Sequence, residues 1–271
     1  MSDRAAKALH AGSLLTPADP PVVEIWNGEG KAPVLATCDH ASNKVPRSLG
    51  RLGLSNEELR RHIGWDIGAA GVTRLLVRRL GAPAILAGYS RLVVDCNRDP
   101  ADTTSMPAVS DGVAVPGNAA LTETARRQRL DALFRPYHQA IEDALDRFAK
   151  RAVHPAVLSI HSFTPTMNGI ARPWHIGILW DRDPRIPVPL LAALRREPRL
   201  VVGDNEPYSA REPAGYTVRT HAVKRGLPHV AVEIRQDLIA DGAGEREWAE
   251  RLAAALTPIL EDPALYHVKH Y

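Results

Sequence analysis

The sequence has few of the features that mark a specialised class of protein. Its 271 residues include two cysteines, Cys38 and Cys96, which cannot form a disulfide framework and are not spaced as a metal-binding pair. Both lie in apolar stretches, so we expect two small buried side chains in a reducing compartment. No apolar run approaches the ~18 residues that a membrane span needs. A membrane protein is therefore not expected.

Charge of one sign is also scarce. The 34 basic and 31 acidic residues leave a net charge of +3, and the two kinds are interspersed. No basic stripe with interleaved aromatic residues is present, so we expect no nucleic-acid partner. No G-x-G-x-x-G follows the first predicted strands, which disfavours a dinucleotide site. The first 21 residues lack the continuous apolar core of a signal peptide, and we expect a cytoplasmic enzyme.

The composition that remains is that of a globular protein, with 45% hydrophobic and 24% charged residues. Apolar runs typical of strands alternate with segments of helical period, notably 65–80 and 119–152. This order predicts a single three-layer α/β domain over residues 22–271, with a largely parallel sheet flanked by helices. Residues 1–21, which end in several prolines, are predicted to be a loose N-terminal arm. The main predicted strands are 22–26, 34–38, 83–87, 92–96, 155–160, 174–180 and 228–234.

Three of the predicted strands lead directly into polar side chains. Val34–Cys38 runs into His40, Val157–Ile160 into His161, and Val230–Val232 into Glu233. In an open α/β sheet, ligands bind just beyond the carboxyl ends of the strands. We therefore expect these three side chains to lie at one edge of the sheet.

The two histidines are candidate metal ligands. Neutral imidazole is the commonest protein ligand for metals, although either ring could instead make a structural hydrogen bond. A catalytic zinc ion (Zn2+) needs about three protein ligands. Asp66 is the expected third ligand, with His62 as the alternative. A carboxylate at the start of a helix could equally serve as a cap.

Glu233 is the candidate general base. A buried glutamate is costly unless it is paired or functional, and beside a metal it can take and return a proton. The alternative is an ion pair with Arg235 or Arg98.

Several donors are candidates for binding a substrate carboxylate. Arginine binds carboxylates through two parallel hydrogen bonds, so we predict substrate contacts for Arg91, Arg98 and Arg235, together with Asn97 and Asn43. The alternative for each arginine is an internal salt bridge to a nearby aspartate.

The candidate residues fall in several short segments: Asp39-His-Ala-Ser-Asn43 with Pro46, Asp66, Ser90-Arg91, Asp95-Cys-Asn-Arg98, Ser159-Ile-His-Ser162, Asn205-Glu-Pro-Tyr208 and Val232-Glu-Ile-Arg-Gln-Asp237. Taken together, these segments resemble the N-formylglutamate amidohydrolase family, in matching order from about residue 33 to 260. A shorter resemblance, to zinc N-acetylmuramoyl-alanine amidases, covers the Ser-Ile-His and Val-Glu segments. The resemblance implies His40, Asp66 and His161 on zinc, with Glu233 as the base. Zinc carboxypeptidase relatives use His-x-x-Glu, whereas Asn43 stands at that position here.

The function that this resemblance implies is zinc-dependent hydrolysis of an N-acyl amino acid, such as N-formylglutamate, in amino-acid catabolism. The expected partner is that small-molecule substrate. Two alternatives are a cell-wall muropeptide amidase, which the missing signal peptide disfavours, and a non-catalytic carboxylate-binding protein on the same fold.

Overall fold

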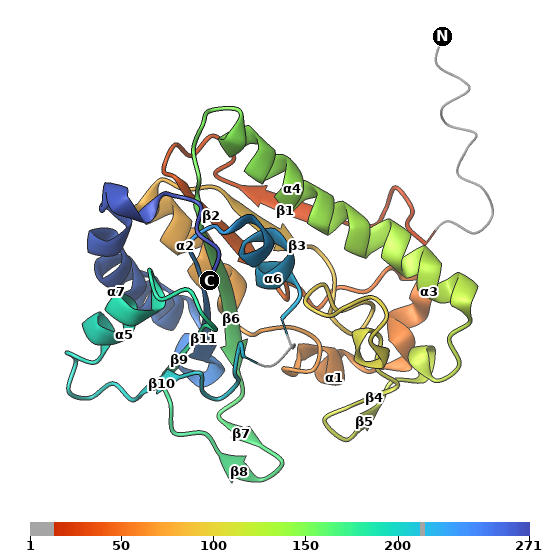
Figure 1. Cartoon of the computed structure of the whole chain (residues 1–271). Coiled ribbons are helices and arrows are strands. Elements are labelled where there is room, and N and C mark those ends of the chain that lie inside the picture. The colour runs from red at the N-terminus through yellow and green to blue at the C-terminus, as the bar shows by residue number, and fades with distance from the viewer. Residues whose placement is uncertain (1–13, 212–214) are drawn as a thin grey trace.

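A seven-stranded sheet in the order β1-β3-β2-β6-β11-β9-β10 forms the centre of the molecule (Figure 1). The computed structural model describes residues 14–211 and 215–271. β3, β2, β6 and β11 are parallel, β1 is antiparallel to β3, and β9 is antiparallel to β11. The largely parallel sheet is thus confirmed. The strands are β1 (Val23–Trp26), β2 (Val34–Cys38), β3 (Ala84–Ala87), β6 (Ala156–Phe163), β9 (Ile176–Leu179), β10 (Val202–Asp204) and β11 (His229–Arg235).

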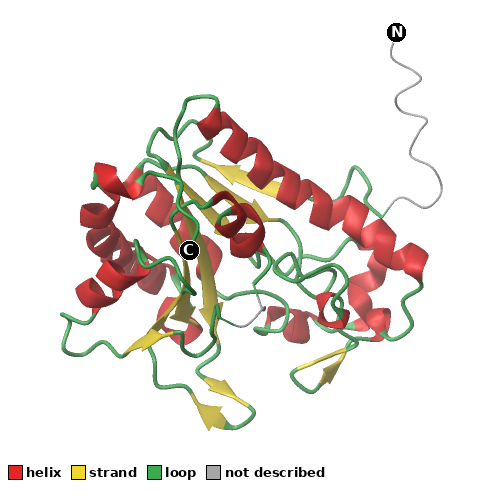
Figure 2. Ribbon diagram, in the orientation of Figure 1, coloured by secondary structure: helices red, strands yellow, loops and turns green. Residues whose placement is uncertain are grey.

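Helices cover both faces of the sheet, as Figure 2 shows. Along β2, Val34 and Ala36 pack into one core with α2 (Ala69–Leu80), α5 (Pro187–Leu194) and α7 (Gly242–Leu260). Leu35 points the other way and packs with α4 (Arg135–Ala149). Alternate residues of a strand face opposite sides, so burial on both sides explains the continuous apolar runs. The predicted three layers are confirmed.

Smaller elements complete the chain. Two short hairpins project from the domain, and no described helix combines the length and apolar character that crossing a membrane would require. Apart from several short 3-10 helices, the remaining helices and short strands of the described residues are α1 (Asn56–Arg60), α3 (Glu123–Arg129), a π-helical stretch (Leu130–Phe134), α6 (Thr217–His221), β4 (Val109–Ser110), β5 (Val113–Ala114), β7 (Thr166–Met167) and β8 (Ile170–Ala171).

The prediction of a strand over residues 92–96 is wrong: the chain forms turns there. Ser90 Oγ donates to the carbonyl of Gly64 at 2.7 Å and accepts from the amide of Leu92, which closes the first turn. The side chains of residues 92–94 are buried in a second core cluster, separate from those on the two faces of the sheet. An apolar run of this length reports burial and does not separate a strand from a buried turn.

Two helix boundaries also differ from expectation. The helix predicted over 65–80 begins only at Ala69, after Gly68 with φ 78°, so Asp66 lies in the preceding turn. The helix predicted over 119–152 is divided into α3, the π-helical stretch and α4.

The expected N-terminal arm is attached to the domain where the structure describes it. Residues 1–13 lie outside the described part of the chain. Leu14 is buried, and its carbonyl accepts from Ser48 Oγ at 2.6 Å. The carbonyl of Pro20 accepts from Tyr89 Oη at 2.7 Å. Residues 14–21 therefore make hydrogen bonds to the domain.

A buried pair of histidines joins α4 to α6. His138 Nδ1 lies 2.8 Å from His221 Nε2, and His138 Nε2 lies 2.9 Å from the carbonyl of Cys96. Since that carbonyl only accepts, His138 Nε2 carries the proton and Nδ1 accepts from His221. The pKa of both histidines is lowered to about 4, mainly by burial and, for His138, also by the charge of His221.

This pair should make the fold sensitive to acid. A histidine whose folded pKa lies below its unfolded value of 6.5 takes up protons on unfolding, so stability is full above pH 6.5 and falls toward pH 4. Between pH 7 and pH 5, urea unfolding of His221→Gln should lose about 1–2 kcal/mol less stability than the wild type. The exposed His154→Gln serves as control, and equal losses in all three proteins would contradict the assignment.

Candidate functional site

The edge formed by β2, β6 and β11 brings together residues far apart in the sequence. Asp39 and His40 directly follow β2, and His161 lies in β6. Glu233 pairs in register with His161 across the parallel β6–β11 ladder. The amide of Asp66 donates to the carbonyl of His40 at 2.9 Å, which brings the turn before α2 to the same place. The polar strand ends therefore meet at one edge, as the sequence predicts.

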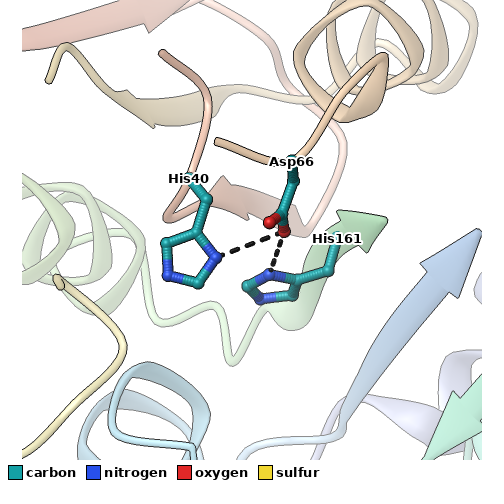
Figure 3. A group of neighbouring side chains, drawn as sticks. All are labelled: His40, Asp66 and His161. Atoms are coloured by element: carbon teal, nitrogen blue, oxygen red, sulfur yellow. Dashed lines mark hydrogen bonds and ion pairs between the residues drawn. The ribbon is translucent and has the colours of Figure 1, made fainter. Parts of the chain in front are cut away.

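His40, Asp66 and His161 form a buried group that could hold a metal ion (Figure 3). One oxygen of Asp66, Oδ2, lies 3.2 Å from His40 Nδ1 and 2.9 Å from His161 Nδ1. The two imidazole rings are 5.1 Å apart between centroids. One ligand atom from each residue lies within 4.8 Å of the others. Two imidazole nitrogens and a carboxylate oxygen are a donor set that suits zinc.

A second carboxylate lies behind each imidazole. His40 Nε2 is 2.7 Å from Asp95 Oδ1, and His161 Nε2 is 3.2 Å from Asp39 Oδ2. Carboxylates on the far nitrogen of a metal-ligating histidine are common, because they fix the tautomer and the orientation of the ring. Here both contacts direct Nδ1 toward Asp66. Short-range sequence patterns do not reveal this arrangement, although Asp39 stands beside His40 in the chain.

Hydrogen bonds keep Asp39 charged despite its burial. Its Oδ1 accepts from Tyr137 Oη at 2.6 Å and from Thr217 Oγ1 at 2.8 Å. Burial alone would raise the pKa of Asp39, but the hydrogen bond with His161 and the charges of both histidines lower it to about 2. The carboxylate is therefore ionised at neutral pH.

Arg91 connects the remaining two carboxylates. Its Nη2 donates to Asp95 Oδ2 at 2.8 Å, and its Nη1 donates to Asp66 Oδ1 at 3.3 Å. Burial would raise the pKa of Asp95, but Arg91 and then His40 hold it far below its usual range. Arg91 thus lies at the site with its guanidinium paired internally.

Glu233 presents an unpaired carboxylate oxygen. The side chain is buried, and its Oε2 has no hydrogen-bond partner among the described residues. Burial raises its pKa to about 7, although the positive charge of nearby His161 opposes the rise. The alternative partner Arg235 is bound to Asp237, with Nε 2.8 Å from Oδ1. A buried polar atom without a hydrogen-bond partner is unusual in proteins, and such atoms often bind a ligand or take part in a reaction.

The other predicted binding residues have different surroundings. Asn97 Oδ1 accepts from the amides of residues 216 and 217 at the start of α6. Asn43 lines a pocket of about 410 Å³ that none of the His40–Asp66–His161 group lines. His62, the alternative metal ligand, has its Nε2 3.4 Å from Asp111 Oδ2. Arg98 is half-buried, and its charge helps to lower the pKa of Asp95.

Two residues with no predicted role, Arg172 and Tyr208, form a hydrogen-bonded pair. Arg172 Nη1 donates to Tyr208 Oη at 3.0 Å. Tyr208 belongs to one of the segments that resembled the family, whereas no feature of the sequence singled out Arg172.

Removal of the Arg91 charge should destabilise the fold. Arg91→Gln leaves Asp66 and Asp95 buried without their guanidinium, and we expect a loss of about 2–4 kcal/mol in the free energy of unfolding at pH 7. Arg61→Gln, which breaks the exposed Arg61–Asp111 pair, should cost about 1 kcal/mol or less. Chemical denaturation of chelator-treated proteins gives both values.

The pH dependence of this loss identifies its cause. Because the pKa of Asp95 is depressed, the stabilisation from its charge is complete above about pH 4 and declines as the pH falls further. The difference between wild type and Arg91→Gln should therefore shrink below about pH 4. A loss under 1 kcal/mol at pH 7 would show that Arg91 does not support the site.

Comparison with known proteins places this site in a family. Residues 32–240 match the family model described as N-formylglutamate amidohydrolase. The crystal structure of a gene product from Agrobacterium tumefaciens is similar, with 37% identity and a TM-score of 0.86 over 92% of this chain and 100% of that one. None of the curated proteins matches the sequence.

A second solved structure shares the fold at lower identity. It is an N-formylglutamate amidohydrolase from Ralstonia eutropha, with 20% identity and a TM-score of 0.62 over 88% of this chain and 97% of that one. The family model covers most of the chain, including His40, Asp66, His161 and Glu233. On these grounds, the chain belongs to the N-formylglutamate amidohydrolase family.

Proposed function

We propose that this protein hydrolyses the amide bond of an N-acyl amino acid in a zinc-dependent reaction, with N-formylglutamate or a similar carboxylate-bearing compound as substrate. The observation that carries the proposal is the buried convergence of two imidazole nitrogens and one carboxylate oxygen next to the unpaired Glu233 carboxyl. The family and the name of the Ralstonia eutropha relative support the choice of substrate.

The side chains present fit a zinc ion. His40, Asp66 and His161 would hold it, with Asp95 and Asp39 orienting the two rings. When bound, zinc supplies Lewis acidity, which polarises a carbonyl group and lowers the pKa of water. Three protein ligands are the number found in catalytic zinc sites, which leave a position for the substrate. The histidines bind a metal as neutral rings, so metal affinity should rise with pH.

Glu233 would carry the proton. A carboxyl group whose pKa is about 7 can accept a proton from the attacking water and then donate it to the departing amine. Its pairing with His161 across β6 and β11 supports this role, and the group that could hold a metal does not include it. The four residues therefore have separate roles: three bind the metal, and one transfers the proton.

The proposal is tested by assaying zinc-loaded and chelator-treated protein against a panel of N-formyl and N-acetyl amino acids. Released amine is detected, and zinc is measured per chain. We expect about one zinc per chain and turnover that depends on it, with the highest kcat/KM for an N-formyl amino acid that has a side-chain carboxylate. Full activity after complete removal of the metal would contradict the zinc mechanism, and no turnover of any N-acyl amino acid would contradict the proposed function.

The role of Glu233 predicts a specific defect. Glu233→Gln keeps the shape of the side chain, so zinc content and melting temperature should stay near wild type. Loss of proton transfer should lower kcat by ~100- to 10,000-fold. Glu197→Gln, a matched change in a surface ion pair with Arg251, should leave kcat unchanged.

The same variant separates three roles. A fall in bound zinc together with activity would make Glu233 a ligand. A fall in melting temperature with normal kcat in the folded fraction would make it structural. Either result, or a folded and metallated variant with normal kcat, would refute the assignment as a general base.

A further inference from the structure

Arg172 offers a guanidinium that no described carboxylate neutralises. It follows the β7–β8 hairpin, where its amide donates to the carbonyl of Pro165 at 2.8 Å. Its side chain is half-buried, donates to Tyr208 Oη at 3.0 Å and lies 4.9 Å from the centre of that ring. Among the residues that the structure describes, Arg172 forms no ion pair, in contrast to Arg91 and Arg235, which both do.

The hairpin holds Arg172 near the metal-binding group. Its guanidinium lies 5.9 Å from the centre of the Phe163 ring. Phe163 is the last residue of β6, two positions after His161 in the same strand. Burial lowers the pKa of His62, and the charges of Arg91 and Arg172 are both close enough to lower it further. Arg172 and Arg91 therefore both lie within electrostatic range of His62.

Tyr208 is hydrogen-bonded to Arg172 and lies within electrostatic range of Glu233. Burial raises the pKa of Tyr208 and the nearby Glu233 carboxylate raises it further, whereas the hydrogen bond from Arg172 opposes the rise. Tyr208 ends the segment of residues 205–208. The amide of Asn205 donates to the carbonyl of Ile178 at 3.0 Å, which attaches the start of that segment to β9.

Close backbone packing brings the segment of residues 205–208 next to the strand that carries Glu233. Gly177 pairs with Glu233 in the sheet, and the carbonyl of Glu206 packs so closely on Gly177 that no Cβ would fit there. Tyr208, two residues further on, is thus held next to the Glu233 strand. Its hydroxyl accepts from Arg172, so its own proton is available to another acceptor.

We propose that Arg172, with Tyr208, binds a carboxylate of the amino-acid half of the substrate. This inference rests on the proposed function and names the subsite for its substrate. A half-buried guanidinium without a carboxylate partner can form two parallel hydrogen bonds to a carboxylate, and Tyr208 can donate a third. Arg91 and Arg235 are less suited to this role, since their guanidinium groups already bind Asp66 and Asp95 or Asp237.

The first test compares Arg172→Gln with Arg182→Gln, a control that removes the same charge from an exposed ion pair with Asp181. With N-formylglutamate and zinc-loaded protein, Arg172→Gln should raise KM by about 10- to 100-fold and change kcat much less, because charge binding serves the ground state and the transition state alike. Arg172→Lys should recover part of the loss. Arg182→Gln should match wild type, and an unchanged KM in a folded Arg172→Gln protein would overturn the proposal.

A second test varies the substrate instead of the protein. N-formylglutamine lacks the side-chain carboxylate, and the α-amide of N-formylglutamate lacks the other. The KM penalty of Arg172→Gln should nearly vanish for whichever compound lacks the carboxylate that Arg172 binds. An equal penalty for both compounds would show that Arg172 acts through the fold rather than through a carboxylate.

A binding measurement separates this subsite from the proposed reaction. Calorimetric titration with free glutamate should show binding to wild type that Arg172→Gln weakens by about 10-fold or more and Arg182→Gln does not. If wild type binds glutamate through Arg172 but hydrolyses no N-acyl amino acid, the proposed function fails and the subsite stands. If hydrolysis occurs and glutamate binding or KM is independent of Arg172, the subsite fails alone. Absence of both binding and hydrolysis would refute both.

Discussion

The shared oxygen of Asp66 is the contact on which the site depends. Oδ2 lies between His40 Nδ1 and His161 Nδ1, and it also accepts from the amide of Ser162 at 3.3 Å. Burial would raise the pKa of this carboxyl, but the two histidines hold it far below its usual range. A buried carboxylate with these partners is a strong electrostatic centre, and a cation is the natural species to share it.

The sheet provides the precision that this contact requires. β2, β6 and β11 are neighbours in a sheet that is covered on both faces, so only their ends can present polar groups to a ligand. Asp39 and Asp95 reach the same edge from behind and orient the rings. Rings held in this way lose little freedom when they bind a metal, which is how outer carboxylates contribute to affinity.

The candidate site residues that stand next to a recognisable strand or helix can be predicted from the sequence. His40, His161 and Glu233 could be predicted because each stands at or near the end of an apolar strand. Asp66 followed from the resemblance and from its position before a helix. The carboxylates that contact these residues could not be predicted. Asp95, for example, contacts His40 because residues 92–96 form turns, whereas their apolar sequence predicts a strand. The position of Arg172 is set by a hairpin, and that of Tyr208 by the packing of Glu206 on Gly177; no pattern in the sequence reveals either.

The arginines show the same limit most clearly. The sequence predicted carboxylate binding for Arg91 and Arg235 from their residue type and their closeness to the motifs. In the structure Arg91 bridges Asp66 and Asp95, and Arg235 pairs with Asp237 two residues away. Which guanidinium remains free for a substrate depends on whether the folded chain brings an internal carboxylate within reach of it, and residue type alone does not show this.

The most direct test of this account is anomalous diffraction at the zinc absorption edge from crystals of the zinc-loaded protein. We expect one strong peak about 2.0–2.2 Å from Nδ1 of His40, Nδ1 of His161 and a carboxylate oxygen of Asp66. Asp95 and Asp39 should remain hydrogen-bonded to Nε2 of His40 and of His161. A peak on the Nε2 atoms with Asp39 or Asp95 as ligand, or a zinc ion bound elsewhere in the molecule, would contradict it.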